Sequence, residues 1–481
     1  MTSTTQTITA AALTRHATAL VEEGFQVTLV AGHDDGDALR VVYLFTSAAD
    51  GERAELHVEV KPVYPHVPSL AGMSPAAARF ERELHDLYGV IPDEHPEPRR
   101  LVRHDHWPRG WYPMRRDAGE SPAFTEISPA GSDVSLGPVH GEIAEPGELR
   151  LTLDGETVRA LDLRLFYVHR GLERLFEGRR PDDAIALTER ISGDTAVGHT
   201  LAFCRAVEDA LGIAVPAATA AARAILLELE RLYNHVTDLG ALCTAAGHDV
   251  LDTHAHRVRE RLLRLNDTVT GHRLLRGALR PGHAALVNPP DPDTLAVLGA
   301  DLAEITALAL DNAMVRDRFT GTGVLTAAQA ADLGTLGYVA RASGLPVDTR
   351  AYAAPTPDFT VHTHDGGDVL ARFLIRAKEV PTSIAIIRHL VNDLTEEPPA
   401  TEPPSPHPRT AASGVGTAEA WRGTVTHRVE LAADRTLTRV KIVDPSFLNA
   451  PALPLAAAGA ELADLPLIAR SINLSAAGHD L

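Results

Sequence analysis

Two short segments gather side chains that can hydrogen-bond or exchange protons. They span residues 190–199 and 471–481, and their polar members are Ser192, Asp194, Thr195, His199, Ser475, His479 and Asp480. Imidazole and carboxylate groups exchange protons when their surroundings bring their pKa near the working pH. Hydroxyl groups stay protonated and act as hydrogen-bond partners. The two segments therefore predict either proton chemistry or a polar cluster whose members satisfy one another.

Thiolate chemistry is nearly excluded. The chain has two cysteines, Cys204 and Cys243, which are far apart and lack C-x-x-C spacing. Two cysteines cannot alone hold an iron–sulfur cluster or make a disulfide framework. Metal ligands must be deprotonated to bind, and serine and threonine hydroxyls are hard donors that stay protonated. We expect no metal site here and place both cysteines in the core, on helices.

Length and charge narrow the class of protein. A chain of 481 residues predicts two domains, and a net charge of −19 argues against a nucleic-acid surface. Residues 1–12 lack the features of a secretory signal. The most apolar stretch, 453–469, carries Glu461 and Asp464, so no membrane span is expected. We predict a cytoplasmic protein that reaches a membrane only through partners.

The first part of the chain predicts a small α/β unit over residues 1–117. Hydrophobic periodicity indicates a helix over 13–24, strands over 25–31, 39–46 and 54–60, and a helix over 75–88 that stops at Gly89. Residues 118–133 have the composition of a linker.

Residues 134–481 predict a larger, mainly helical domain with small β regions, so the fold class is α+β. A strand pair is expected at 148–153 and 157–163, joined by Asp154-Gly155. Helices are expected at about 182–211, 217–246, 250–271 and 292–315, and strands at 422–443. The Pro-rich segment 396–413 is expected to be a mobile loop.

Both units carry motifs of known families. The first contains Glu81-Arg82-Glu83-Leu84-His85-Asp86-Leu87-Tyr88-Gly89, His95-Pro96, Arg99-Arg100 and Pro113-Met114-Arg115-Arg116-Asp117. It is similar to the 30-kDa subunit of respiratory complex I. The second contains Gly137-Pro138-Val139-His140, His169-Arg170-Gly171-Leu172-Glu173 and Glu419-Ala420-Trp421-Arg422-Gly423. It resembles the complex I 49-kDa subunit and, more closely, the large subunit of formate-hydrogenlyase-type (group 4) nickel–iron hydrogenases.

The resemblance assigns the two polar segments to the metal-binding ends of a hydrogenase. The family patterns are R-x-C-G-x-C-x-x-x-H and D-P-C-x-x-C. Their four cysteine positions are occupied here by Ser192, Thr195, Ser475 and Gly478. All nickel-ligating cysteines are thus missing, and we expect neither a nickel–iron centre nor hydrogen turnover by this chain.

The family also implies partners. A small subunit with a 4Fe–4S cluster would dock against this chain, and the pair would sit on ion-translocating subunits of a membrane arm. NADH or ferredoxin would deliver electrons through other subunits, because this chain lacks a G-x-G-x-x-G motif. In complex I the equivalent cavity receives the quinone headgroup, which makes quinone the candidate ligand.

The resemblance places Glu173 and Arg422 in the same cavity as the two polar segments. A buried arginine needs an anionic partner, so Arg422 is expected to pair with a carboxylate. One hypothesis is a proton-conducting pocket in which His199 or Glu173 exchanges protons with a substrate. The alternative is a relic pocket that holds the subunit interface.

Two departures count against complex I-like quinone chemistry. Phe203 stands where the family has a tyrosine that hydrogen-bonds the quinone. His140 matches a first family histidine, but the second has no counterpart in residues 141–146. His199 or His479 could substitute for the missing histidine.

His169-Arg170 matches a pair beside the partner's cluster. There a fixed positive charge would raise the reduction potential, and the alternative is an ordinary interface ion pair.

Two functions of different classes remain. The first is an electron- and proton-handling subunit of a membrane oxidoreductase without nickel. The second is a non-catalytic scaffold that couples conformational change. A true hydrogenase is a distant third.

Overall fold

The computed structural model describes residues 3–47, 49–120, 122–123, 134–140, 145–352, 356, 359–394 and 410–481. Most of the expected linker, and residues 396–409 of the expected mobile loop, lie outside this set. The last residues of that expected loop, Ala412 and Ser413, instead begin a strand.

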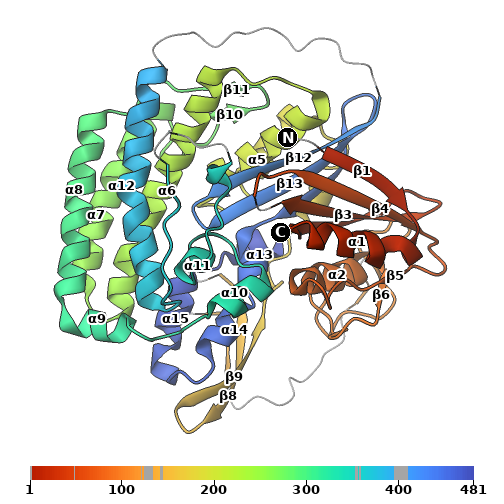
Figure 1. Ribbon diagram of the computed structural model, residues 1–481, viewed down its shortest axis with the longest axis horizontal. Coiled ribbons are helices and arrows are strands. Elements are labelled where there is room, and N and C mark those ends of the chain that lie inside the picture. The colour runs from red at the N-terminus through yellow and green to blue at the C-terminus, as the bar shows by residue number, and fades with distance from the viewer. Residues whose placement is uncertain are drawn as a thin grey trace.

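The N-terminal unit is a four-stranded sheet with two helices against it (Figure 1). The strand order is β1 (Ser3–Ile8), β4 (Arg53–Val60), β3 (Leu39–Ser47) and β2 (Phe25–Asp34). β1 runs parallel to β4, and the other pairs are antiparallel. Helices α1 (Leu13–Glu22) and α2 (Pro75–Tyr88) contribute Leu13, Phe80 and Leu84 to the core. The predicted helices and strands are confirmed, whereas β1 was not predicted.

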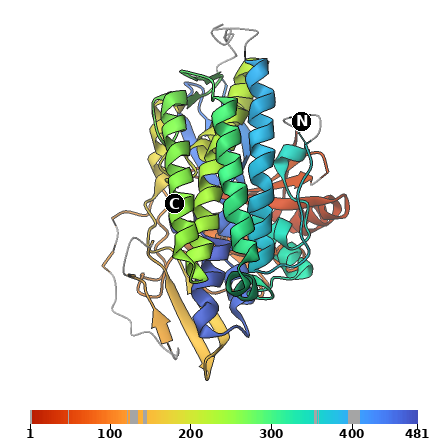
Figure 2. The ribbon, with the colours of Figure 1, turned by 90° about the vertical axis from the view of Figure 1, so that its left-hand side faces the viewer.

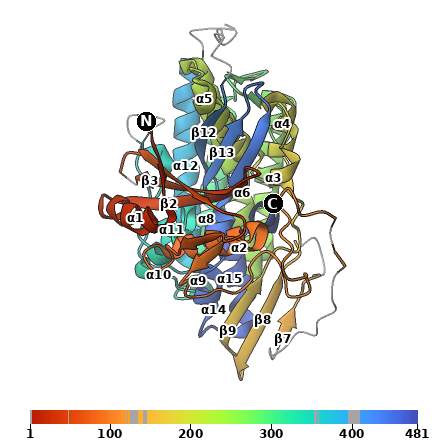
Figure 3. The same cartoon turned by 90° about the vertical axis from the view of Figure 1, so that its right-hand side faces the viewer.

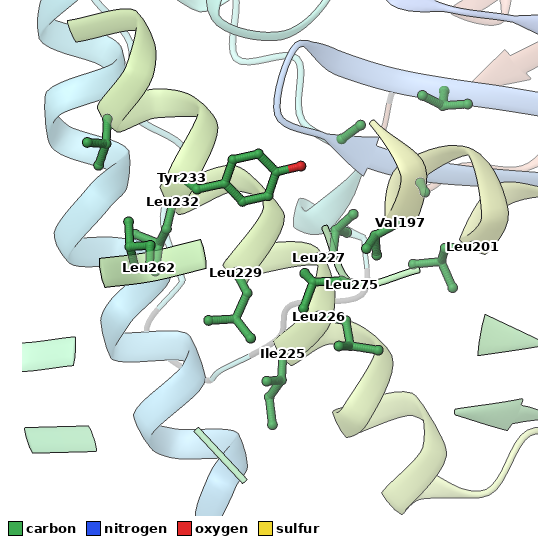
Figure 4. Packing of buried hydrophobic residues seen from close by; sticks show 14 of the residues in the cluster. Val197, Leu201, Ile225, Leu226, Leu227, Leu229, Leu232, Tyr233, Leu262 and Leu275 are labelled. Atoms are coloured by element: carbon green, nitrogen blue, oxygen red, sulfur yellow. The ribbon is translucent and has the colours of Figure 1, made fainter. Parts of the chain in front are cut away.

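Four long helices form one side of the larger unit (Figure 2). They are α6 (Ala217–Ala245), α7 (Asp249–Thr270), α8 (Pro292–Asp311) and α12 (Val369–Asp393). Figure 4 shows Leu229, Leu232 and Tyr233 of α6 among the buried apolar side chains that this packing creates. The expected helix over 292–315 is wrong at its end, because Asn312 accepts backbone N–H groups and starts α9 (Ala313–Phe319).

A three-stranded antiparallel sheet lies between the helices and the N-terminal unit (Figure 3). Its strands are β12 (Ala412–Ala420), β13 (Gly423–Leu431) and β14 (Leu437–Val443), and α5 (Ala196–Leu211) packs on β12 and β13. A Cβ on Gly416 would approach the Ala202 carbonyl oxygen to 2.1 Å. Glycine at this position therefore lets the backbone of α5 lie directly on the strand.

The expected single helix over 182–211 is wrong: it is two helices, α4 (Pro181–Thr188) and α5, separated by residues 189–195. The carboxylate of Glu230 accepts hydrogen bonds from the backbone N–H groups of Val197 and Gly198, at 2.7 and 2.9 Å. This caps α5 from a neighbouring helix, so local sequence does not reveal the break. The segment between α4 and α5 carries Ser192, Asp194 and Thr195.

The remaining elements are short. β7 (Val134–Leu136), β8 (Glu148–Asp154) and β9 (Thr157–Arg164) form a sheet that confirms the predicted pair at 148–163. The others are β5 (His66–Pro68), β6 (Ile91–Asp93), β10 (Leu279–Arg280), β11 (His283–Ala284), α3 (Leu172–Leu175), α10 (Ala327–Leu333), α11 (Gly337–Ala342), α13 (Pro445–Asn449), α14 (Ala452–Ala457), α15 (Leu465–Ile472) and α16 (Ala476–Asp480), with 3₁₀ turns at Ala10–Ala12, Thr349–Ala351 and Leu462–Asp464.

The predicted α+β class, a small α/β unit followed by a larger and mainly helical one, is confirmed. Among the described residues, no helix combines the length and apolar character needed to cross a bilayer. Cys204 on α5 and Cys243 on α6 are fully buried, as expected.

Candidate functional site

Arg422 joins the first polar segment to the C-terminal one. Its guanidinium donates to both carboxylate oxygens of Asp194, each at 2.7 Å, and its Nε donates to the Asn473 carbonyl at 2.8 Å. Its other support is the ring of Trp421, whose centroid lies 4.0 Å from the guanidinium carbon. The expected pairing of Arg422 with a carboxylate is therefore present.

This pair fixes a charge at the site. Burial alone would raise the pKa of the Asp194 carboxyl, but Arg422 outweighs burial and lowers that pKa to about 2. Hydrogen bonds from Ser192 and Thr195 at 2.8 and 3.0 Å act in the same direction. Asp194 remains ionised near neutral pH. Its side chain is 38% exposed, so solvent also reaches it.

The two polar segments meet through hydroxyl groups. Ser192 Oγ and Ser475 Oγ lie 2.9 Å apart, and Ser475 Oγ also accepts the Gly478 N–H at 3.0 Å. At Gly478 a Cβ would meet Asp444 Oδ2 at 2.5 Å, so the Asp444 carboxylate fills the space that a side chain would need. Three protonated hydroxyls and a glycine whose side-chain space is filled do not fit the thiolate set of a nickel–iron centre.

His199 lies in a buried chain of hydrogen bonds. Its Nε2 is 3.0 Å from Asp444 Oδ2, and its Nδ1 is 3.1 Å from His427 Nε2. None of the three residues is more than 1% exposed. Burial lowers the pKa of His427 well below its ordinary value, and the neighbouring His199 lowers it further. Burial opposes ionisation of Asp444, yet the hydrogen bond from His199 and the positive charge of Arg422 help to lower the pKa of that carboxyl.

His479 and Asp480 face the N-terminal unit instead. His479 Nδ1 is 2.7 Å from Asp480 Oδ1, and Arg79 of α2 donates to His479 Nε2 at 2.7 Å. Asp480 Oδ2 also accepts the Val168 N–H at 3.0 Å. Since Arg79 is a donor, Nε2 accepts and His479 is neutral in this arrangement. Burial lowers the pKa of His479, which favours the same neutral form.

Glu173 belongs to a buried ionic network between the two units. Its carboxylate lies 2.8 Å from Arg439 and 3.2 Å from Lys441, and Lys441 Nζ is 2.6 Å from Glu83 of α2. Although burial opposes ionisation, Arg439 and Lys441 lower the pKa of Glu173 to about 2. At Glu83 burial outweighs the nearby cations, and the pKa of its carboxyl is raised. Glu173 is therefore a fixed anion near neutral pH.

A small cavity lies between Glu173 and the C-terminal segment. The expectation that Arg422, His199 and the first polar segment share this cavity is wrong, since they are not among its lining residues. Its polar lining includes His169, Glu173, Asp444, His479 and Asp480, and its apolar lining is Phe80, Leu87, Val102, Met114, Phe166, Ile442 and Phe447. The volume of about 20 Å³ corresponds to about one water molecule. A quinone ring would need the lining to move apart.

The two residues expected beside a partner cluster lie on the surface next to this site. The Arg170 guanidinium donates to the carbonyls of Arg190, Ile191 and Ala477 at 2.7–2.8 Å, so it ties the two polar segments together. Among the described residues no carboxylate forms a salt bridge with it. His169 Nδ1 is 2.5 Å from the Asp480 carbonyl oxygen.

The side chains of the other predicted positions do not join the hydrogen-bonded clusters of the described residues. His140 contacts the Gly147 carbonyl at 2.7 Å and reaches none of the cluster residues through a hydrogen bond in the described part of the chain. Phe203 is buried against Phe176 and His427. His254 and His256 are exposed on α7.

Sequence reasoning missed Asp444, His427, Arg79 and Lys441. Asp444-Pro445 does have the form of a helix start, and Asp444 caps α13 through the Ser446 N–H at 2.7 Å. His427 follows the alternation of an ordinary strand, and nothing in its local sequence marks it.

Three family models match the chain. Residues 6–122 match the 30-kDa subunit of respiratory-chain NADH dehydrogenase, and residues 246–414 match its 49-kDa subunit. Residues 170–254 match nickel-dependent hydrogenase. The order of the matches agrees with the resemblance drawn from the motifs.

Relatives that align with most of the chain agree with the family models. Hydrogenase-4 component G of Escherichia coli is 33% identical over 84% of this chain and 74% of its own length. Formate hydrogenlyase subunit 5 of the same organism is 32% identical over 94% of this chain and 84% of its own length. A chain of the membrane-bound sulfane sulfur reductase, an archaeal respiratory membrane complex, superposes with a TM-score of 0.66 at 26% identity over 72% of this chain and 98% of that chain.

Proposed function

The chain belongs to the family of hydrogenase-4 component G and formate hydrogenlyase subunit 5, and on that premise we propose that it is a nickel-free subunit of a membrane-associated oxidoreductase complex. In this proposal it handles protons beside a 4Fe–4S cluster held by a partner small subunit. Electrons pass through that cluster and not through a metal in this chain.

The observation that carries the proposal is the cluster around Asp194 and Arg422. An ionised pair and two facing serine hydroxyls meet there, on the two segments that resemble the family's metal-binding motifs, and Asp194 remains open to solvent. His199 lies in the separate hydrogen-bonded chain with Asp444 and His427. Preorganised charges of this kind stabilise charge that develops on a bound molecule. His199 is the group suited to proton exchange, because Glu173 is held as an anion by Arg439 and Lys441.

The remaining roles follow from the same family. Arg170, exposed and without a carboxylate partner in the described chain, is suited to face the partner's cluster. A fixed positive charge there would raise the potential of that cluster. A quinone is the candidate ligand of the cavity. We further propose that the complex lies on the inner face of the cell membrane, attached through ion-translocating subunits, and that NADH or ferredoxin delivers electrons elsewhere.

A second candidate function is a non-catalytic scaffold. The size of the cavity favours it, because a volume of about 20 Å³ leaves room for about one water molecule. Most polar groups of the site also have partners within the chain, as expected of a structural interface. In this case the chain transmits conformational change and turns nothing over.

The decisive experiment uses the intact complex, purified from its native membrane with the small subunit. Nickel is measured by elemental analysis and quinone by extraction. Bound quinone without nickel supports the redox subunit. The absence of both nickel and quinone supports the scaffold. Nickel at one per complex would overturn both proposals, since it requires a ligand set other than Ser192, Thr195 and Ser475.

A further inference from the structure

We propose that Asp444 and His427 are positioning residues that set the proton affinity of His199. The three side chains hold a proton at a site that reaches the cavity through Asp444 and has no exit at its other end. The inference rests on the proposed function, because it assigns the proton of that site to one imidazole. The three residues come from different elements: His199 from α5, His427 from β13, and Asp444 from the start of α13.

The row of hydrogen bonds through Asp444, His199 and His427 has one end at the cavity and the other in the core. Asp444 lines the cavity, and His199 follows it at 3.0 Å. His427 comes next at 3.1 Å, and its Nδ1 is buried without a hydrogen-bond partner among the described residues. A proton that enters at Asp444 therefore has no further acceptor beyond His427. The arrangement holds a proton and does not pass it through.

Hydrogen-bond roles define the two states. When His199 is neutral, its Nε2–H donates to the Asp444 carboxylate and its Nδ1 accepts the Nε2–H of His427. When His199 takes up a proton, both of its nitrogens donate, so His427 must accept at Nε2 and carry its own proton at Nδ1. A buried donor without a partner is unfavourable. His427 thus opposes protonation, whereas the Asp444 carboxylate favours it.

Other titratable and charged groups also face this hydrogen-bonded chain. Glu230 of α6 accepts the N–H of Gly198, next to His199, at 2.9 Å, and burial raises the pKa of that carboxyl to about 8. In the sheet, the residues opposite His427 are Gly416 of β12 and Ile442 of β14, and neither titrates. On α5 the aromatic ring of Phe203 packs against it. The charge of Arg422 favours the ionised form of Asp444, and the charge of Asp444 in turn acts on His479. Asp444 and His427 are the side chains hydrogen-bonded to the ring nitrogens of His199, and in this proposal their balance controls its protonation.

The test follows the ring nitrogens of ¹⁵N-labelled histidine in the full-length chain by NMR, from about pH 5 to about pH 8. His199→Gln identifies the His199 signals. Asp444→Asn should lower the protonation midpoint of His199 by at least about one pH unit, the effect of removing an opposite charge at this range.

The two His427 variants should move the midpoint in opposite directions. His427→Gln supplies an acceptor oxygen without a tautomer change and should raise it, whereas His427→Phe removes the acceptor and should lower it. His235, which is fully buried and 2.8 Å from Glu379, is the internal control, and its signals should not move.

A purely structural role predicts a different result. If Asp444 and His427 only hold α5 against the sheet, the variants lower the melting temperature and leave the His199 midpoint unchanged. That result overturns the proposal. If Asp444→Asn does not fold, the opposite shifts of the two His427 variants decide alone. Absence of a redox ligand from the complex would refute the proposed function but would leave this titration as it is.

Discussion

Replacing Glu173 by glutamine is expected to weaken the whole chain, because its carboxylate is the shared partner of two buried cations. In the native protein Arg439 and Lys441 face Glu173 and Glu83. Glu173→Gln keeps the shape and removes one negative charge, which leaves a buried network with a net positive charge. Breaking a buried ion pair in this way costs about 3–5 kcal/mol.

The pKa of Glu173 gives an independent magnitude. A fall from 4.5 to about 2 corresponds to about 3 kcal/mol of stabilisation at about 1.4 kcal/mol per pKa unit. Because the folded-state pKa lies below the unfolded one, this contribution is fully present above about pH 4.5. It is lost as the pH falls toward about 2.

Thermal unfolding of the full chain measures the effect. At about 2.1 cal/mol/K per residue, 481 residues have an unfolding entropy of about 1 kcal/mol/K, so Tm should fall by about 3–5 °C. The matched control is Glu260→Gln, which removes an exposed carboxylate paired with Arg264 and Arg273 and should leave Tm almost unchanged. Adding Lys441→Met to Glu173→Gln should recover part of the loss, since it removes the excess charge.

Either of two results would contradict the role assigned to Glu173. The first is a Tm of Glu173→Gln equal to that of the exposed control near neutral pH. The second is a gap between wild type and variant that stays constant as the pH falls through 4.5, since only an ionised Glu173 can contribute it.

Three further predictions concern the site. Gly478→Ala should lower the free energy of unfolding by about 1–3 kcal/mol in denaturant, because its Cβ would lie 2.5 Å from a buried carboxylate oxygen. The control Gly193→Ala should be tolerated, since the nearest contact of its Cβ is at 3.9 Å. Equal effects of the two substitutions would contradict this prediction. Gly416→Ala should likewise lower stability by more than about 1 kcal/mol, since its Cβ would meet a helix carbonyl at 2.1 Å, and a neutral result would refute the close contact between helix and strand. Arg422→Met should raise the carboxyl pKa of Asp194 from about 2, measurable by ¹³C NMR, so the carboxyl would begin to protonate at a higher pH; an unchanged titration would exclude the ion pair.

Local patterns in the sequence predicted much of the fold. Helix α2 was predicted at its observed bounds because Pro75 and Gly89 mark its two ends and the apolar face between them is regular. The turn at Asp154-Gly155 placed the β8–β9 pair in the same way. In each case the deciding residues lie within the element.

The misses have non-local causes. The break between α4 and α5 depends on Glu230, which is more than thirty residues away from the N–H groups it caps. Helix α12 was not predicted, because its buried face carries Arg372, Arg376 and Glu379 and it contains Pro381, which hide the apolar periodicity.

The candidate site was predicted only in part. The motifs located Ser192, Asp194, Ser475 and Arg422, and these residues do form one hydrogen-bonded cluster. The partner of His199 could not be inferred, since Asp444 reaches it from a segment of the chain with no metal-site motif.

The position of the Asp444 carboxylate also limits which side chains position 478 can hold. It occupies the space beside Gly478 that a side chain at that position would need. A cysteine introduced there would require Asp444 to move, which would break its contact with His199. Introducing cysteines at Ser192, Thr195, Ser475 and Gly478 one at a time would therefore pass through a destabilised variant. A thiolate set could be built into this chain only together with a change at position 444.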